Sequence, residues 1–333
     1  QNHNIPRSQL VLSSTHSHAA PHLSGGLRNL FAQPSTPEQQ AATDRYTVQV
    51  IEAVEKCIAA AIESRRDANI EMGQGTADIA VNRRVLRDGI WSGFGVQADG
   101  VVDRRVRILR CTAPTGELIG GAYLYACHCT SLGPSFNAVS GDWAGLSASR
   151  LESLHPGCVF LPIIGCGADA NPEPRDSYAA AEQHAAAMVD AVQHVLKTPR
   201  LDPLTTFPTS HFGFAGLIPE RPTSQQLDEL ASSDNAHAQR WAEAMQQVLR
   251  DMGRIPESYP MPIHTWQFGD ALTWIFLGGE VVADYQFAIA KLMPTKETWV
   301  AAYCDDVFAY VASEKMLAEG GYEVDRSMLY NLQ

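Results

Sequence analysis

Three histidines stand close together near the start of the chain, in the segment LVLSSTHSHAAPHL over residues 10–23. His16 and His18 are two residues apart, so on an extended segment both imidazole rings point to the same side. Such a pair lets one ring bind a metal ion while the other transfers a proton. H-x-H pairs also arise by chance, so a metal site requires further ligands from elsewhere in the chain.

Three further polar side chains each follow, closely or directly, an apolar run of strand-like composition. They are His128, Glu280 and Tyr310. Taken singly, His128 is typical of a core residue, Glu280 of a helix cap and Tyr310 of a packed aromatic. Ligands of open α/β sheets, however, bind at the carboxyl ends of the strands. The shared placement of these residues and His16 therefore predicts a metal site at the C-terminal strand ends.

The elements that position these side chains alternate between strand and helix. Apolar runs predict strands at residues 9–15, 118–127, 158–164, 271–280 and 298–304. Helical patterns cover residues 36–65, 176–197 and 223–252, and a further helix that ends near Lys291. This alternation predicts the α/β class, with a mixed, mostly parallel sheet flanked by helices.

The first of these helices carries its own start signal. Thr36 can cap it, Pro37 suits the first turn, and Gln39 completes a capping box. Apolar residues then recur at helical spacing and predict one buried face, made of Val50, Ile51, Val54, Ile58 and Ile62.

Composition limits the classes of partner. The chain has 333 residues, of which 45% are hydrophobic and 19% charged, so it can bury a substantial core. Its net charge of −12 argues against nucleic-acid binding, which needs clustered Lys and Arg. Small molecules, lipids and proteins remain as partners. No apolar run reaches about 18 residues, so we expect no transmembrane helix.

Several other polar residues have structural interpretations. Asp169 and Asn171 lie just past a strand and before a proline, where an Asx turn is the usual outcome. Cys127 and Cys129 flank His128, but on an extended strand their thiols point away from it. This argues against a zinc site built from cysteines.

Six motifs occur in the order found in the neutral/alkaline, non-lysosomal ceramidases, and the chain resembles this family over residues 9–325. The motifs are SSTHSHAAP (13–21), GQG with NRR (73–75 and 82–84), ACHCTSLGPSFNAVSGDWAG (126–145), GCGADANP (165–172), FLGGE (276–280) and YCDDVFAYVASEKMLAEGGYE (303–323). The resemblance implies a zinc amidohydrolase that uses zinc-bound water to cleave the N-acyl bond of ceramide-like lipids, giving a sphingoid base and a fatty acid.

The resemblance also implies individual roles. The family's zinc ligands fall on His16, His128, Glu280 and Tyr310. Its general base falls on His18 and its substrate-site tyrosine on Tyr322. Its oxyanion-assisting arginine falls on Arg83, with Arg84 as the alternative.

The chain departs from the family pattern in places. The family usually has Pro-Gly-Glu where this sequence has Gly278-Gly279-Glu280. The family segment before the first histidine pair and the C-terminal immunoglobulin-like domain have no counterpart in the sequence. We therefore expect a single ceramidase-like catalytic domain over residues 1–333.

Two alternatives stay open. One is a zinc amide or ester hydrolase that acts on a smaller, non-sphingolipid substrate, and the other is a non-catalytic metal-binding relative. The expected partner is a lipid or amide small molecule, with peripheral membrane contact compatible with the resemblance. The resemblance to this family weakly favours a secreted or periplasmic location. The sequence does not predict an oligomeric state.

Overall fold

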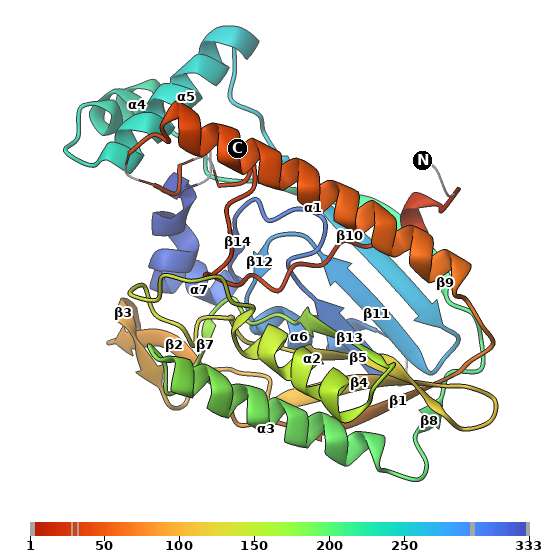
Figure 1. Cartoon of the computed structure of the whole chain (residues 1–333). Coiled ribbons are helices and arrows are strands. Elements are labelled where there is room, and N and C mark those ends of the chain that lie inside the picture. Colours follow the sequence, from red (N-terminus) through yellow and green to blue (C-terminus); the bar gives the residue numbers. More distant parts are fainter. Residues whose placement is uncertain (1–3, 28, 32, 294–296, 331–333) are drawn as a thin grey trace.

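The protein is described by a computed structural model that covers residues 4–27, 29–31, 33–293 and 297–330. Its longer strands are β1 (Asn69–Thr76), β4 (Arg105–Thr112), β5 (Leu118–Tyr125), β6 (Val159–Ile164), β9 (Thr209–Leu217), β10 (Tyr259–Phe268), β11 (Leu272–Leu277) and β13 (Glu297–Ala301). With the short β8 (Asp202–Pro203), they form two sheets in the orders β6–β5–β4–β1–β8 and β13–β11–β10–β9. These two sheets form the centre of the molecule (Figure 1).

Two smaller sheets carry much of the candidate site. One joins β3 (Ile90–Gln97), β2 (Ala80–Arg87) and β7 (Ala170–Pro172), in that order. The other is the parallel pair of β12 (Glu280–Val281) and β14 (Tyr310–Val311). Each of them pairs segments that lie far apart in the sequence, β2 with β7 and β12 with β14.

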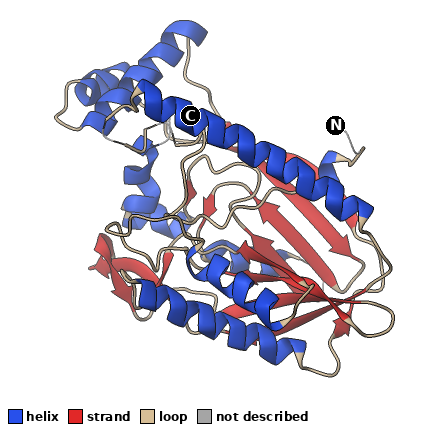
Figure 2. Cartoon of the chain, viewed as in Figure 1, coloured by secondary structure: helices blue, strands red, loops and turns tan. Residues whose placement is uncertain are grey.

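Helices surround the sheets (Figure 2). They are α1 (Pro37–Glu63), α2 (Asp142–Leu154), α3 (Tyr178–Leu196), α4 (Ser224–Ala231), α5 (Ala236–Met252), α6 (Asp284–Leu292) and α7 (Glu314–Glu319). α2 and α3 pack on each other and on the first sheet, α6 packs on β13, and α4 and α5 form a hairpin. None of the helices described between residues 4 and 330 is long and apolar enough to cross a lipid bilayer.

The predicted α/β class and mixed sheets are confirmed, but the expectation of mostly parallel strands is wrong. Seven of the ten described strand pairings are antiparallel, and only β5–β6, β11–β13 and β12–β14 are parallel. A parallel pair needs a crossover of about a dozen residues, whereas several links here are hairpin turns. Asp88 and Gly89, both with positive φ, form such a turn between β2 and β3.

Most predicted elements are present. The predicted strands at 118–127, 158–164, 271–280 and 298–304 contain β5, β6, β11 and β13. The predicted helix at 176–197 contains α3, while the one at 223–252 is broken into α4 and α5, where Asn235 caps the second helix.

The strand predicted at residues 9–15 is not formed. A short 3-10 turn covers Arg7–Gln9, and the following residues make only an isolated bridge between Ser13 and Cys304. The partner segment explains this, because Tyr303 and Asp305 both have positive φ and cannot extend a regular ladder.

α1 begins as predicted, with the Thr36 cap and the reciprocal Gln39 capping box both formed. Its predicted buried face is wrong, because the structure buries no residue of α1 and leaves Ile51 55% exposed. Helical spacing determines which side chains share a face, but not whether another element covers that face.

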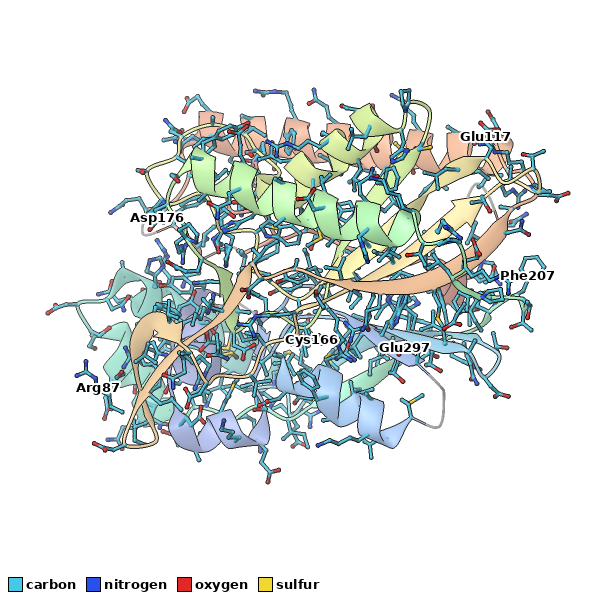
Figure 3. All side chains as sticks on the ribbon, turned by 90° about the horizontal axis from the view of Figure 1, so that it is seen from below. Arg87, Glu117, Cys166, Asp176, Phe207 and Glu297 are labelled. Atoms are coloured by element: carbon cyan, nitrogen blue, oxygen red, sulfur yellow. The ribbon has the colours of Figure 1, made fainter. Side chains whose placement is uncertain are left out.

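The interior lies instead between α3 and the first sheet, and it includes Met188, Val192 and Ile108. Figure 3 shows Cys166 within this interior, with Glu117, Asp176 and Phe207 toward the periphery. The contrast between α3 and α1 gives a direct test of which helix stabilises the fold.

Met188→Ala should lower the free energy of unfolding by about 2–5 kcal/mol, because it leaves a cavity in the core. Ile51→Ala, the matched change on α1, should alter it by no more than about 0.5 kcal/mol. Chemical denaturation of both variants measures the difference. Equal losses would mean that α1 buries its apolar face, contrary to this account.

Candidate metal centre and active site

The four predicted metal ligands come from four separate segments. His16 lies in the loop that follows the Arg7–Gln9 turn, and His128 comes shortly after β5. Glu280 and Tyr310 are opposite one another in the β12–β14 pair. The turn into β12 requires glycine at position 279, where φ is 79°.

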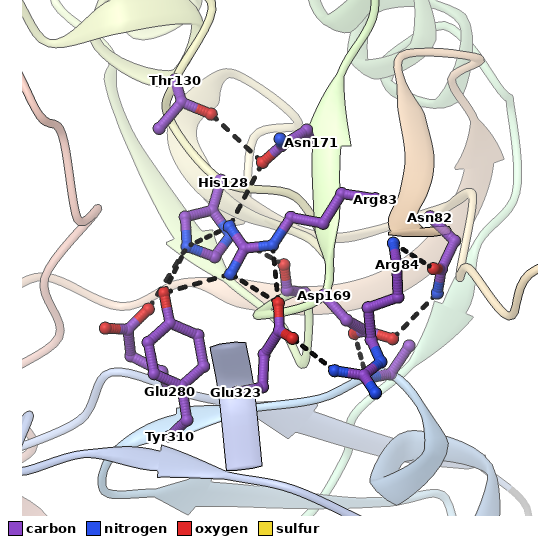
Figure 4. Close-up of polar contacts among 12 residues, drawn as sticks. Asn82, Arg83, Arg84, His128, Thr130, Asp169, Asn171, Glu280, Tyr310 and Glu323 are labelled. Carbon is purple, nitrogen blue, oxygen red and sulfur yellow. Dashed lines mark hydrogen bonds and ion pairs between the residues drawn. The ribbon is translucent and has the colours of Figure 1, made fainter. Parts of the chain in front are cut away.

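Nitrogen and oxygen atoms of these side chains converge, and Figure 4 shows His128, Glu280 and Tyr310 of the group. Oε2 of Glu280 lies 3.3 Å from Nε2 of His16 and 3.2 Å from Nε2 of His128. The Tyr310 hydroxyl lies 3.4 Å from Nε2 of His128. Ligands about 2.0–2.1 Å from a tetrahedral zinc ion are about 3.4 Å apart, so these separations fit such an ion.

The Glu280 carboxylate supplies an independent observation. Its Oε2 is buried and, among the described residues, makes no hydrogen bond of normal geometry. Burial would by itself raise the pKa of Glu280, but His16 and His128 offset this effect and lower that pKa to about 2. An ionised, buried oxygen without a hydrogen-bond donor suits a cation, and the donor set suits zinc.

His18 is the third histidine of this group. Its Nε2 lies 3.1 Å from Nε2 of His16, and the ligand nitrogens of His16, His18 and His128 all lie within 4.8 Å of one another. The geometry thus offers two ligand sets: the three histidines, or His16 and His128 with Glu280 and Tyr310. In the second set the exposed His18 is left beside the metal.

His18 and His128 are both held in the neutral form by their surroundings. Burial and the Arg83 cation lower the pKa of His128 to about 4. Loss of hydration around the His18 ring is the largest cause that lowers the pKa of His18, to about 3. The neighbouring rings of His16 and His128 add to this effect. At neutral pH both rings are unprotonated, as metal binding or proton acceptance requires.

Contacts around the histidines fix their orientation. Nδ1 of His128 donates to the Gly167 carbonyl at 3.0 Å, which leaves Nε2 directed at the centre. The Tyr303 ring lies 4.8 Å from the His16 ring, centroid to centroid. His16 and Tyr303 both have positive φ, at 53° and 57°, a strained conformation that clusters at functional sites.

Of the two candidate arginines, Arg83 is the one beside the centre. Its guanidinium donates to the Tyr310 hydroxyl at 3.2 Å and lies 3.5 Å from Nε2 of His128. Arg84 turns away and donates to Glu319 at 3.1 Å and to the Gly320 carbonyl at 2.8 Å. Of the two neighbours Arg83 is the one that contacts His128 and Tyr310, and its role in catalysis stays a prediction.

Tyr322 lies at the edge of the centre. Its ring is 5.5 Å from the Tyr310 ring and 5.0 Å from the Phe94 ring, measured between centroids. Burial, with the Glu280 charge, raises the pKa of Tyr322 to about 12, so its hydroxyl stays protonated and can donate.

Several site residues were not predicted from sequence. Tyr303 packs on His16, Phe94 on Tyr322, and the buried Glu323 pairs with Arg83. Tyr303 and Glu323 are the first and last residues of the motif at 303–323, which was the only signal for them, whereas Phe94 lies outside the quoted motifs.

Residues with predicted structural roles also border the site. The Asp169 carboxylate accepts hydrogen bonds from the Ala283 backbone amide at 2.8 Å and from the Asn82 side-chain amide at 3.0 Å. It therefore links two segments that are distant in the sequence. Cys127 and Cys129 are buried, and neither belongs to the metal-capable group found among the described residues.

Comparisons with known proteins agree with this fold. No protein-family model and no curated protein matches the sequence. The neutral ceramidase from Pseudomonas aeruginosa has a similar structure, with a TM-score of 0.62 and 14% identity over 95% of this chain and 57% of that one. A ceramidase complexed with C2 gives 0.63 and 14%, over 97% and 59%. The chain therefore has a ceramidase-like fold and spans under three fifths of those chains.

The geometry predicts about one zinc ion per chain. His128→Ala removes a buried donor, so zinc affinity should fall by more than about 100-fold. His22→Ala, in the same N-terminal segment but outside the cluster, should leave it unchanged. Chelator competition with metal analysis by mass spectrometry measures both. Unaltered zinc binding by His128→Ala would show that the metal binds elsewhere.

Proposed function

We propose that this chain is a zinc-dependent amidohydrolase that cleaves the N-acyl bond of ceramide-like lipids to a sphingoid base and a fatty acid. The proposal depends above all on the convergence of four donors, separated by 3.2 to 3.4 Å where they meet, around an ionised buried carboxylate. The ceramidase-like fold supports it. The zinc ligands would be His16, His128, Glu280 and Tyr310.

Each remaining side chain then has a chemical task. Zinc bound there supplies a Lewis acid and activates water near neutral pH. His18, exposed beside the centre, accepts a proton from the attacking water and later delivers one to the leaving nitrogen. Arg83 and Tyr322 donate hydrogen bonds to the negative charge that develops on the acyl oxygen.

Arg83 is suited to this task because it stays cationic. Burial opposes its charge, but Tyr310 and Glu323 raise the pKa of the Arg83 guanidinium above its ordinary value. A buried cation that is already oriented needs little reorganisation when the oxyanion forms, which is the source of this kind of catalysis.

Apolar surface beside the site supports a substrate with an aliphatic arm. Phe94 is 53% exposed although its ring lies 5.1 Å from the Arg83 guanidinium and contacts Tyr322. Val96, on the same strand, is also 53% exposed. An acyl or sphingoid chain laid on this surface would remove it from water. The substrate would then come from a membrane or another lipid source.

One observation favours a second candidate function. The exposure of His18 opens the centre to solvent, and small water-soluble amides or esters can reach such a site. A zinc hydrolase of a smaller, non-sphingolipid substrate is therefore the alternative. Long-chain and short-chain substrates distinguish the two.

His18→Ala should keep its zinc and lose about 10²- to 10⁴-fold in kcat on a fluorescent N-acyl-sphingosine. The zinc-loaded wild-type chain and His22→Ala, both expected to be active, are the references. A short-chain amide and an ester are assayed in parallel.

Each outcome has a meaning. Cleavage of only the short substrates by the wild-type chain would favour the second candidate, and zinc without any turnover would indicate a non-catalytic metal-binding relative. Loss of zinc from His18→Ala would favour the three-histidine ligand set. Full activity of that variant would remove His18 from the mechanism.

A further inference from the structure

We propose that Glu323 is a positioning residue that holds Arg83 beside the metal centre and keeps it from pairing with the Glu280 carboxylate. The inference rests on the proposed function for its catalytic consequence, but not for its effect on metal binding. The roles implied by the family resemblance do not include one for Glu323.

Glu323 joins two neighbouring arginines of β2 (Figure 4). Its side chain has no exposed surface. Oε1 of Glu323 accepts hydrogen bonds from Nε and Nη2 of Arg83, at 2.9 and 2.8 Å. Oε2 of Glu323 accepts a hydrogen bond from Nη1 of Arg84. Each oxygen thus holds one arginine, and charged, two-pronged contacts of this kind fix a guanidinium plane as well as its position.

The other contacts of Arg83 are weaker. They reach the Asn171 side chain at 3.4 Å, the Tyr310 hydroxyl at 3.2 Å and Nε2 of His128 at 3.5 Å. The ion pair with Glu323 is therefore what determines where the guanidinium lies. Without it, one buried carboxylate that attracts the Arg83 charge is that of Glu280, whose Oε2 lies 3.2 Å from the same His128 nitrogen that Arg83 faces.

An ion pair between Arg83 and Glu280 would compete with a metal ion for the same oxygen. It would also carry the guanidinium away from the place where an acyl oxygen develops charge. Glu323 therefore protects both functions, since it neutralises Arg83 without using the metal-binding carboxylate.

The same turn presents Tyr322 to the site. Tyr322 and Glu323 are consecutive and begin a π-helical turn directly after Gly321, whose φ is 106°. A side chain at position 321 would collide with the Trp91 ring, so glycine anchors the turn against β3. Glu323 thus links the turn to β2 through its ion pairs. It therefore holds Tyr322 and Arg83 in fixed positions relative to one another.

Glu319 offers a matched control. Its carboxylate accepts from Arg84 at 3.1 Å, and its side chain is only 9% exposed. Among the described residues it makes no ion pair with Arg83, and its other partner is Lys315. Removing the charge of Glu319 therefore tests the loss of a buried carboxylate that pairs with Arg84 and Lys315 but not with Arg83.

The experiment compares Glu323→Gln with Glu319→Gln in the full chain. For Glu323→Gln we expect zinc affinity to fall by about 10-fold in chelator competition and kcat to fall by about 100-fold with KM changed by less than about 3-fold. Glu319→Gln should keep both within about 3-fold, because within the residues that the structure describes Glu319 pairs with neither Arg83 nor the proposed ligands and its effect is independent of theirs. In an Arg83→Met background, Glu323→Gln should lower kcat no further, because the two residues act as one unit.

Equal effects of the two Gln variants, or an undiminished effect of Glu323→Gln in the Arg83→Met background, would overturn the proposal. If Glu323→Gln does not fold, Glu323→Asp keeps the buried charge but is too short to reach both arginines, and the same kcat loss is expected. If the wild-type chain cleaves no amide, the proposed function fails, while the zinc affinities still decide the role of Glu323.

Discussion

The rest of the site depends on the buried Glu280 carboxylate. Withdrawing an ionised carboxylate from water costs several kcal/mol unless a positive charge or hydrogen-bond donors replace the lost hydration. Here Oε2 of Glu280 faces two imidazole nitrogens and makes no hydrogen bond of normal geometry within the described part of the chain, while the nearby cation of Arg83 is paired with Glu323. The negative charge is left facing the point where the donors converge, and a divalent metal ion bound there would supply the missing positive charge.

The fold brings these groups together through short contacts between distant segments. The two-residue parallel pair of β12 and β14 sets Glu280 opposite Tyr310, and the 303–305 turn holds the His16 loop through hydrogen bonds from Ser14 and Asp305 backbone amides. The two large sheets form the scaffold of this arrangement, whereas the proposed ligands come from loops and from β12 and β14. The fold itself is shared with solved ceramidases at only 14% identity.

Sequence patterns predicted the elements better than their partners. Local signals, such as the Thr36 capping box, predicted where helices begin. The direction of strand pairing and the exposure of α1 depend on tertiary contacts, and the spacing of apolar residues carries no information about these. For the site, H-x-H spacing and strand-end placement brought His16, His18 and His128 into one hypothesis. They offered nothing on Tyr303 or Phe94, because a packed aromatic at a site looks in sequence like any core aromatic.

The most direct test is anomalous diffraction at the zinc edge from crystals of the zinc-loaded chain. We expect one peak about 2.0–2.2 Å from Nε2 of His16, Nε2 of His128, Oε2 of Glu280 and the Tyr310 hydroxyl, with His18 outside the coordination sphere. A peak bound by the three histidines with Tyr310 remote, or no peak at this centre, would contradict it.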